Sequence, residues 1–273
     1  MLAVHIRGLV DSLARAADTM QDVPREVVTA RLLARGKRWL ARRGLPCVPV
    51  GAGNAKTGVP STYRAVGPTC GPCPHEATCY ADRGRTGIHS RHSDRSVEAA
   101  VYGAALASTV ALLTGTLARL HVSGDGGQAG EDFQAVEWSP EYIQGLTTLR
   151  LVLQDEGLAQ PDRPHAWGYT RLPCDPVEFQ RLGIAMRRSG YRGALGAVVV
   201  RDWSEIRTAH EALRASLHPA PDLAGPRPMR CREQLDGTPC RDCGLCWTRP
   251  DRAVAFLAHG SGARDVVSDL QGP

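Results

Sequence analysis

The chain alternates short apolar runs, each about the length of a β-strand, with longer stretches of helical character. The strand-like runs are 47–50, 63–66, 120–123, 166–170, 197–201 and 254–259, and the helical stretches are 96–117, 140–156, 176–189 and 204–216. Strands that alternate with helices are typical of βαβ units, in which consecutive strands run parallel. The pattern predicts an α/β fold with mostly parallel strands, built as a full or partial βα (TIM) barrel, or alternatively as an open doubly wound sheet.

The pattern and the local composition divide the chain into three segments. Residues 1–45 are expected to form N-terminal helices, and residues 46–217 the βα core with a first cysteine cluster. Residues 218–273 begin with a proline-rich linker that cannot continue the preceding helix. That linker leads to a second cysteine cluster, expected to be a metal loop, and to a closing strand.

Seven of the nine cysteines fall into two short loops. The first loop carries Cys70, Cys73 and Cys79, and the second carries Cys231, Cys240, Cys243 and Cys246. Such clustering indicates a thiophilic metal. Three cysteines leave one position of a four-iron cluster or of a zinc site open, whereas four are a complete set of ligands.

The second loop contains three cysteines at two-residue intervals, which is the spacing of bacterial ferredoxin ligands. This spacing favours one or two [4Fe-4S] clusters. Zinc is the alternative metal, although structural zinc sites more often use two CxxC pairs separated by a longer stretch. Reduced thiols without any metal are a third interpretation.

The start of the chain lacks the apolar core and cleavage site of a signal peptide, which predicts a cytoplasmic protein whose thiols persist as metal ligands. Residues 99–118 contain no charge over 20 positions, the length of a membrane span. Because this stretch is rich in small residues and leads into a strand-like run, we expect a buried helix and no membrane association. The net charge of +5 permits an anionic partner without requiring one.

Polar residues follow several of the expected strands, and in parallel sheets the chemistry gathers at the carboxyl ends of the strands. The candidate catalytic residues at these positions are His121, Ser123, Asp125, Tyr169 and Arg171. The alternative is that His121 is a core histidine and Asp125 a turn residue. Asn54 and Lys56 lie in a glycine-bounded stretch and are candidates for binding an anionic ligand or cofactor.

The ordered set of motifs resembles a known group. The motifs are 54–58 (Asn-Ala-Lys-Thr-Gly), the first cysteine loop ending in Cys-Tyr-Ala, 121–125 (His-Val-Ser-Gly-Asp), 169–171 (Tyr-Thr-Arg) and the C-terminal cysteines. Over residues 50–260 this order resembles the phage- and plasmid-encoded gene-product-88-like proteins. That group is in turn similar to the radical S-adenosylmethionine enzymes, in which a partial βα barrel carries three cysteines in the loop after its first strand.

The resemblance implies an iron–sulfur protein of a mobile genetic element, in which an accessible iron held by the first loop would bind S-adenosylmethionine. The first loop has the order and position of the cysteines in those enzymes, with the spacing CxxCxxxxxC in place of CxxxCxxC. The implied substrate is a small molecule or a nucleic acid.

A zinc-stabilised nucleic-acid-binding protein is the rival interpretation. In such a protein the metal-bound cysteine loops would have a structural role, and the basic residues between Arg31 and Arg43 would contact phosphates. Aromatic residues make up 5% of the chain, which offers little surface for base stacking. The two interpretations differ in the metal that they require and in the partner that they predict.

Overall fold

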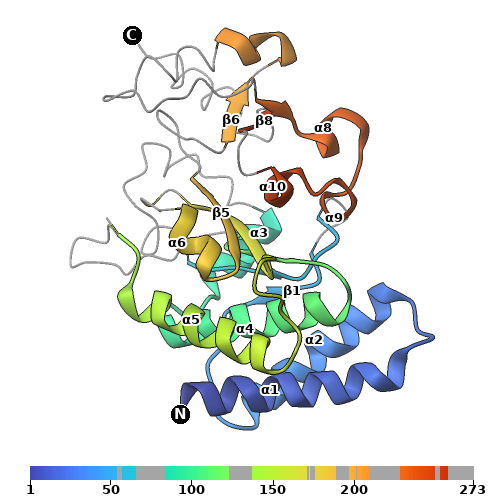
Figure 1. Ribbon diagram of the computed structural model, residues 1–273, viewed down its shortest axis with the longest axis vertical. Coiled ribbons are helices and arrows are strands. Elements are labelled where there is room, and N and C mark those ends of the chain that lie inside the picture. Colours follow the sequence, from blue (N-terminus) through green and yellow to red (C-terminus); the bar gives the residue numbers. More distant parts are fainter. Residues whose placement is uncertain are drawn as a thin grey trace.

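The structure is a computed structural model of the 273-residue chain. It describes residues 1–53, 57–65, 84–122, 137–170, 172, 176–188, 197–200, 202–208, 228–249 and 253–257. Helices and strands are mixed along the described chain, as the sequence predicts for an α/β protein. Figure 1 shows a helical layer on one side of a central sheet and the C-terminal elements on the other side.

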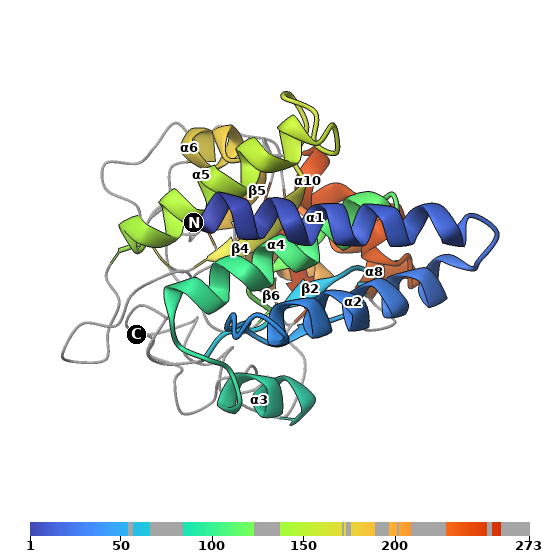
Figure 2. The same cartoon turned by 90° about the horizontal axis from the view of Figure 1, so that it is seen from below.

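The helical layer contains four long helices. These are α1 (Leu2–Ala17), α2 (Arg25–Ala41), α4 (Val97–Leu113) and α5 (Pro140–Asp155). Helix α1 contacts the other three, and it is seen crossing the layer in Figure 2. Shorter elements complete the helical part: η1 (Asp18–Met20), α3 (Gly84–Arg91), α6 (Pro176–Arg181) and η4 (Trp203–Glu205).

Helix α4 is the uncharged stretch of the sequence, and every residue from Ala99 to Ala111 is buried. The side chain of Ser96 caps its start by accepting a hydrogen bond from the backbone N–H of Ala99. Small residues allow α1, α2, α5 and the sheet to surround this helix closely. The expected buried helix is therefore confirmed. No helix among the described residues has both the length and the apolar character needed to cross a bilayer.

The main sheet has five strands in the order of the chain. They are β1 (Val50–Gly51), β2 (Ser61–Thr62), β3 (Ala118–Leu120), β4 (Ala166–Thr170) and β5 (Ile184–Arg188). Only the pairing of β1 with β2 is antiparallel in this sheet, and each later strand is parallel to its neighbour. The described strands thus confirm the mostly parallel α/β arrangement.

The two faces of the main sheet have different characters because side chains alternate along each strand. Leu120, Ala166 and Ile184 point to the helical layer and belong to its apolar core. Arg119 and Trp167 are paired in register on β3 and β4, and they lie on the opposite face. The C-terminal elements cover that second face (Figure 1).

A second, smaller sheet contains strands from two distant segments. It consists of β6 (Ala197–Val200), β8 (Val254–Leu257) and β7 (Met229–Arg230), all parallel. Val200, Ile206 and Ala255 form a separate small apolar cluster beside it. Among the described pairings, β6 joins the C-terminal strands and not β5.

The helix expected over 176–189 is wrong in its second half. Helix α6 ends at Arg181, Gly183 adopts a left-handed conformation at φ +71°, and β5 begins at Ile184. The amide of His165 donates a hydrogen bond to the carbonyl of Gly183 at 2.7 Å, and β5 then continues the parallel ladder of β4. Tertiary pairing overrides the helical propensity of this short segment.

A buried polar cluster lies where the chain enters β4. The imidazole of His165 is within 3.1 Å of Ser108 Oγ through Nδ1 and of the Leu182 carbonyl through Nε2. The nearby guanidinium of Arg150 donates to the backbone carbonyls of Gln160 and Arg163. Burial, followed by the charge of Arg150, lowers the pKa of His165 to about 4.

This pKa predicts a loss of stability in acid. The unfolded chain takes up a proton on His165 near pH 6.5, whereas the folded chain does so only near pH 4, so the stability present above pH 6.5 is lost as the pH falls towards 4. In His165→Asn, urea unfolding at several pH values should show a slope of unfolding free energy against pH that is smaller by about 1.4 kcal/mol per unit in this window. An unchanged slope would show that His165 is protonated in the folded protein.

Candidate metal centre and strand-end site

The four C-terminal cysteines lie in a compact run of turns that begins at the end of β7. Cys231 directly follows β7 and precedes helix α8 (Arg232–Asp236). Cys240 and Cys243 are the first and last residues of the one-turn helix α9 (Cys240–Cys243), and Cys246 lies in α10 (Leu245–Thr248). Gly244, at φ +67°, reverses the chain between these two turns, a conformation that favours glycine.

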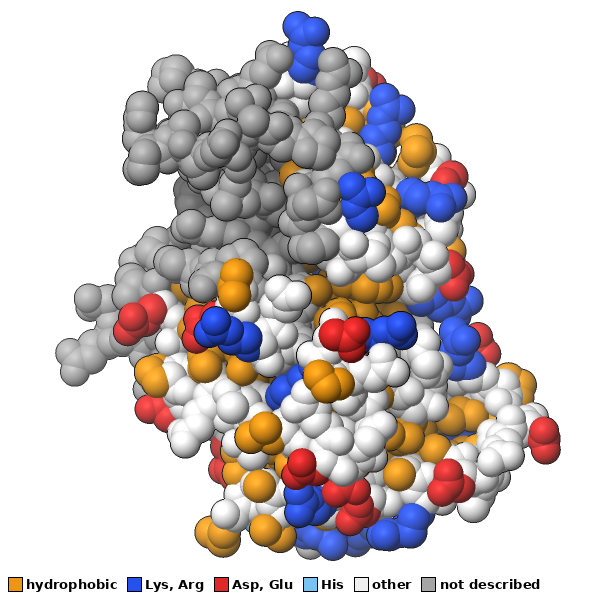
Figure 3. All heavy atoms as spheres, in the orientation of Figure 1, with side chains coloured by type: hydrophobic (Ala, Val, Ile, Leu, Met, Phe, Trp, Pro, Cys, Tyr) orange, Lys and Arg blue, Asp and Glu red, His pale blue; other side chains and the backbone are white. Residues whose placement is uncertain are grey.

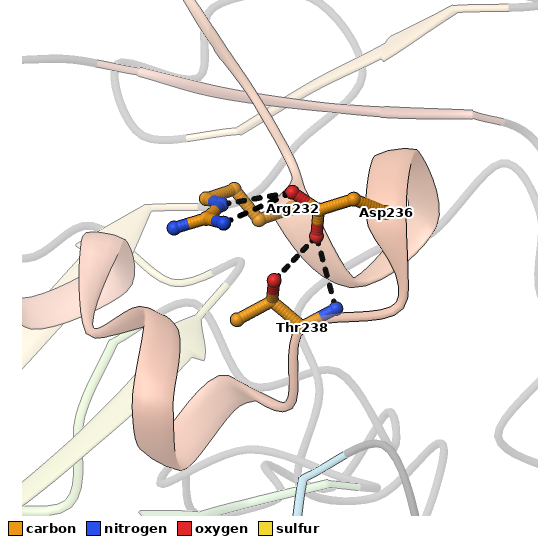
Figure 4. Close-up of polar contacts among 3 residues, drawn as sticks. All are labelled: Arg232, Asp236 and Thr238. Carbon is orange, nitrogen blue, oxygen red and sulfur yellow. Dashed lines mark hydrogen bonds and ion pairs between the residues drawn. The ribbon is translucent and has the colours of Figure 1, made fainter.

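Hydrogen bonds to Asp236 fix the segment between the first two cysteines of the loop. The carboxylate of Asp236 accepts from Arg232 Nη2 at 3.0 Å and from the backbone N–H of Thr238 at 3.0 Å, and also from the Thr238 hydroxyl. Figure 4 shows both partners pointing towards this one carboxylate. The turn therefore holds the separation of Cys231 and Cys240 without any metal–ligand bond.

The thiols of this loop influence one another electrostatically. Burial, followed by the neighbouring thiols of Cys246, Cys231 and Cys243, raises the pKa of Cys240 to about 12, and the guanidinium of Arg119 opposes this change. Burial also raises the pKa of Cys231, with a smaller contribution from Cys243. None of the four forms a disulfide bond. They lie within 15 positions of one another along the chain.

The donor set matches a four-iron cluster or a tetrahedral zinc ion in number and chemistry. Within the described part of the chain, however, no three His, Cys, Asp or Glu side chains converge closely enough to hold a metal ion. Electrostatic interaction among the thiols reaches further than a metal–ligand bond. The side chains would move closer together when a metal binds, because a complete set of ligands closes around the ion only on binding.

The cysteine loop is attached to the second face of the main sheet. The hydroxyl of Tyr169, on β4, donates a hydrogen bond to the Cys246 sulfur at 3.0 Å. The rings of Trp167 and Trp247 lie 5.4 Å apart between their centroids, and Tyr169 meets Phe256 edge to face at 5.8 Å. Sheet and loop are therefore in direct contact through strand β4.

A second connection joins α9 to the N-terminal part of the chain. The guanidinium of Arg241 lies 3.6 Å from a carboxylate oxygen of Glu26, near the start of α2. Its side chain also lies against Gly58, where an added Cβ would come within 3.2 Å of Arg241 Cδ. Gly58 ends the stretch 54–58, of which the structure describes only residues 57 and 58. The predicted ligand-binding residues Asn54 and Lys56 lie outside the described residues.

His121 occupies a strained position at the carboxyl end of β3. It has φ +55°, a left-handed conformation that is uncommon for any residue other than glycine. Its backbone N–H donates to Thr62 Oγ1 at 2.9 Å, and its Nε2 is hydrogen-bonded to the Tyr142 hydroxyl at 2.8 Å. Such strain persists where the surrounding contacts enforce it, as they often do at functional sites.

The His121 imidazole is buried and neutral. Burial, followed by the charge of Arg64, lowers its pKa to about 3. Its Nδ1 atom has no hydrogen-bond partner within the described residues. A neutral imidazole whose Nδ1 has no hydrogen-bond partner among the described residues can form a hydrogen bond with a ligand or transfer a proton to or from it.

Arg64 and Trp138 also lie near His121. Arg64 is two residues beyond the end of β2, is 1% exposed, and lies with its guanidinium carbon 5.5 Å from the centroid of the Tyr142 ring. The Trp138 ring lies 6.2 Å from that of His121. The sequence analysis did not single out Arg64 or Tyr142. A charged residue within two positions of the end of a strand is the sequence signal that could have identified Arg64.

The structure brings the predicted strand-end residue Tyr169 into contact with the predicted C-terminal cysteine cluster, and several other predicted site residues lie outside its described part. Tyr169 contacts the C-terminal cysteines, a partner that the strand-end argument did not foresee. His121 and Tyr169 lie near the carboxyl ends of the adjacent strands β3 and β4. The predicted site residues outside the described part of the chain are Asn54, Lys56, Cys70, Cys73, Cys79, Ser123, Asp125 and Arg171.

The fold and the site geometry are the only basis for assigning a function. No protein-family model, curated protein or solved structure matches this chain. The features that bear on function are the four C-terminal thiols, their contacts with the sheet, and the strained histidine at the end of β3.

Proposed function

We propose that the chain is an iron–sulfur protein of a mobile genetic element. The four cysteines of the C-terminal loop support this proposal most directly, because their number and spacing suit a [4Fe-4S] cluster. A further cluster would be held at the first loop by Cys70, Cys73 and Cys79. With three protein ligands, that cluster would keep one iron accessible.

We further propose a radical S-adenosylmethionine-like enzyme, built on a full or partial βα barrel. The order of β2 to β5 along the chain, with all these strands parallel and helices packed on one face, supports this architecture. A bound cluster would supply electrons to S-adenosylmethionine at the accessible iron. The substrate would lie against the carboxyl ends of the strands.

The protein's own residues would position that substrate. His121 would offer Nδ1 of its neutral ring, with Ser123, Asp125 and Arg171 as further polar contacts. Asn54 and Lys56 would hold an anionic part of the cofactor or substrate. The hydroxyl of Tyr142 keeps the His121 ring in one orientation, which favours a positioned contact over a mobile one.

Anaerobic reconstitution with iron and sulfide tests the proposal. We expect a brown protein with a broad absorption band, containing roughly eight irons per chain when both loops hold four-iron clusters. Addition of S-adenosylmethionine should then change the electron paramagnetic resonance spectrum of the reduced first cluster. A protein that stays colourless and binds only zinc would refute the iron–sulfur proposal.

A zinc-stabilised nucleic-acid-binding protein is the second candidate, and a stripe of arginines on α2 favours it. The exposed residues Arg31, Arg35, Arg38 and Arg42 follow at intervals of four, three and four positions, which places them on one side of a helix. By contrast, the face drawn in Figure 3 intermixes basic and acidic side chains among its described residues. The α2 stripe thus presents several positive charges on one side of a helix, as contact with a phosphate backbone requires.

This candidate predicts salt-dependent binding to DNA or RNA. Replacing three of the stripe arginines, in Arg31→Gln/Arg38→Gln/Arg42→Gln, should reduce the slope of log affinity against log salt by about 2.7, since each phosphate contact contributes about 0.9. Fluorescence anisotropy with a labelled duplex at several salt concentrations measures this slope.

The matched control removes the same charge from exposed arginines elsewhere, in Arg15→Gln/Arg163→Gln/Arg181→Gln. It should leave most of the slope in place. Binding that is absent, or that both triple variants weaken equally, would eliminate α2 as a nucleic-acid-binding surface.

A further inference from the structure

We propose that Tyr169 and Arg119, on the second face of the main sheet, set the reduction potential of the cluster held by the C-terminal cysteines. This inference rests on the proposed iron–sulfur function. It assigns Tyr169 a role different from the substrate contact expected of a strand-end residue, and it gives a role to Arg119, which no strand-end argument selected. Both would be positioning residues that act through the cluster.

Tyr169 is placed to donate a hydrogen bond to a ligand sulfur. Its hydroxyl lies 3.0 Å from the Cys246 sulfur, and a thiolate at that position is a better acceptor than a thiol. Edge-to-face contacts with Phe256 at 5.8 Å and with Trp167 at 6.0 Å hold the phenol ring from two sides. The hydroxyl is therefore directed at the sulfur by packing as well as by the hydrogen bond.

Arg119 supplies a positive charge on the same side of the sheet. Its guanidinium carbon lies 5.2 Å from the centroid of the Trp167 ring, which in turn lies 5.4 Å from the ring of Trp247, the residue after Cys246. Its Nε atom is buried and has no hydrogen-bond partner within the described residues. A buried guanidinium nitrogen left in this way indicates a further acceptor beside it. A sulfur of a bound cluster is an acceptor of the required charge.

The two residues act in the same direction. Reduction adds one electron to the cluster, and no bond of the protein is made or broken. A hydrogen-bond donor and a nearby cation stabilise the more negative, reduced state more than the oxidised state, so both raise the reduction potential. Adjacent strands carry the two residues, since Arg119 is paired with Trp167 and Tyr169 follows two positions later on β4.

Potentiometric titration of the reconstituted protein with dithionite, followed by electron paramagnetic resonance, tests this inference. The signal of the C-terminal cluster is identified as the one that Cys240→Ser lacks. In Tyr169→Phe we expect its midpoint potential to become more negative, with the ratio of reduced to oxidised cluster at the wild-type midpoint falling roughly tenfold. Arg119→Gln should shift the potential in the same direction, and Arg119→Lys, which keeps the charge, should shift it less.

Tyr102→Phe is the matched control, because it removes a buried tyrosine hydroxyl that is bonded to His5 on the far side of the sheet. It should leave the potential unchanged. Because Tyr169→Phe and Arg119→Gln change independent positions, the potential can be measured in one variant if the other does not fold. A cluster of unchanged potential in both Tyr169→Phe and Arg119→Gln would overturn the inference and leave the iron–sulfur function standing. A protein that binds zinc alone would overturn both.

Discussion

Replacing Cys240 with serine is expected to halve the iron content of the reconstituted protein, from roughly eight to roughly four irons per chain. Cys240 is the thiol that interacts with all three others in the C-terminal loop, and a serine hydroxyl is a poor ligand for the soft iron of a cluster. Iron and acid-labile sulfide, determined per chain, measure the effect. The remaining four irons belong to the first loop.

Cys47→Ser is the matched control for this substitution. Cys47 lies outside both cysteine clusters, and its thiol donates a hydrogen bond to the Val48 carbonyl. Because it belongs to neither proposed set of ligands, its replacement should leave the iron content unchanged. An equal loss of iron in the two variants would indicate that misfolding, and not the loss of a ligand, causes the effect.

Leu106→Ala is expected to lower the free energy of unfolding by about 2–5 kcal/mol, the usual cost of removing a large buried side chain from a core. Leu106 is fully buried in the middle of α4. It packs against Gly36 of α2 so closely that a Cβ on Gly36 would collide with Leu106 Cδ1. The absence of a side chain at Gly36 is thus what permits the two helices to approach.

The same contact predicts that the effect of Gly36→Ala depends on the residue at 106. In the wild-type protein the added methyl group overpacks the interface, at a cost of about 1–3 kcal/mol. In Leu106→Ala the methyl group enters the space that the leucine leaves, and alanine is also the better helix former by about 1 kcal/mol, so the substitution should become stabilising. Urea unfolding of the four proteins gives the double-mutant cycle. Additive effects would contradict the packing described for α2 and α4.

The sequence predicts those elements best whose pattern is local. The strand expected at 166–170 has the bounds of β4, and the uncharged stretch forms the buried helix α4. The helix predicted over 176–189 is wrong in its second half because β5 is specified by its pairing with β4. That pairing joins two separate segments, and the local sequence carries no signal of it. The pairing of β6 with β8 is likewise a long-range contact, and the two segments carry no local signal that they are neighbours.

The site shows the same division between local and long-range information. Cysteine spacing alone indicates that Cys231, Cys240, Cys243 and Cys246 belong together, and the structure places them in successive short turns after β7. Spacing cannot reveal which strand this loop rests on. The contacts of Tyr169 and Arg119 with the loop depend on the chain folding back over the second face of the sheet, which only the tertiary structure specifies.

The metal content of the protein purified without oxygen tests the central claim most directly. Elemental analysis by plasma mass spectrometry, together with acid-labile sulfide, should give roughly eight irons and eight sulfides per chain, and no stoichiometric zinc. A content of four irons would assign a cluster to one loop alone, and Cys240→Ser would show whether it is the C-terminal one. One or two zinc ions per chain with neither iron nor sulfide would contradict the account and favour the nucleic-acid-binding alternative.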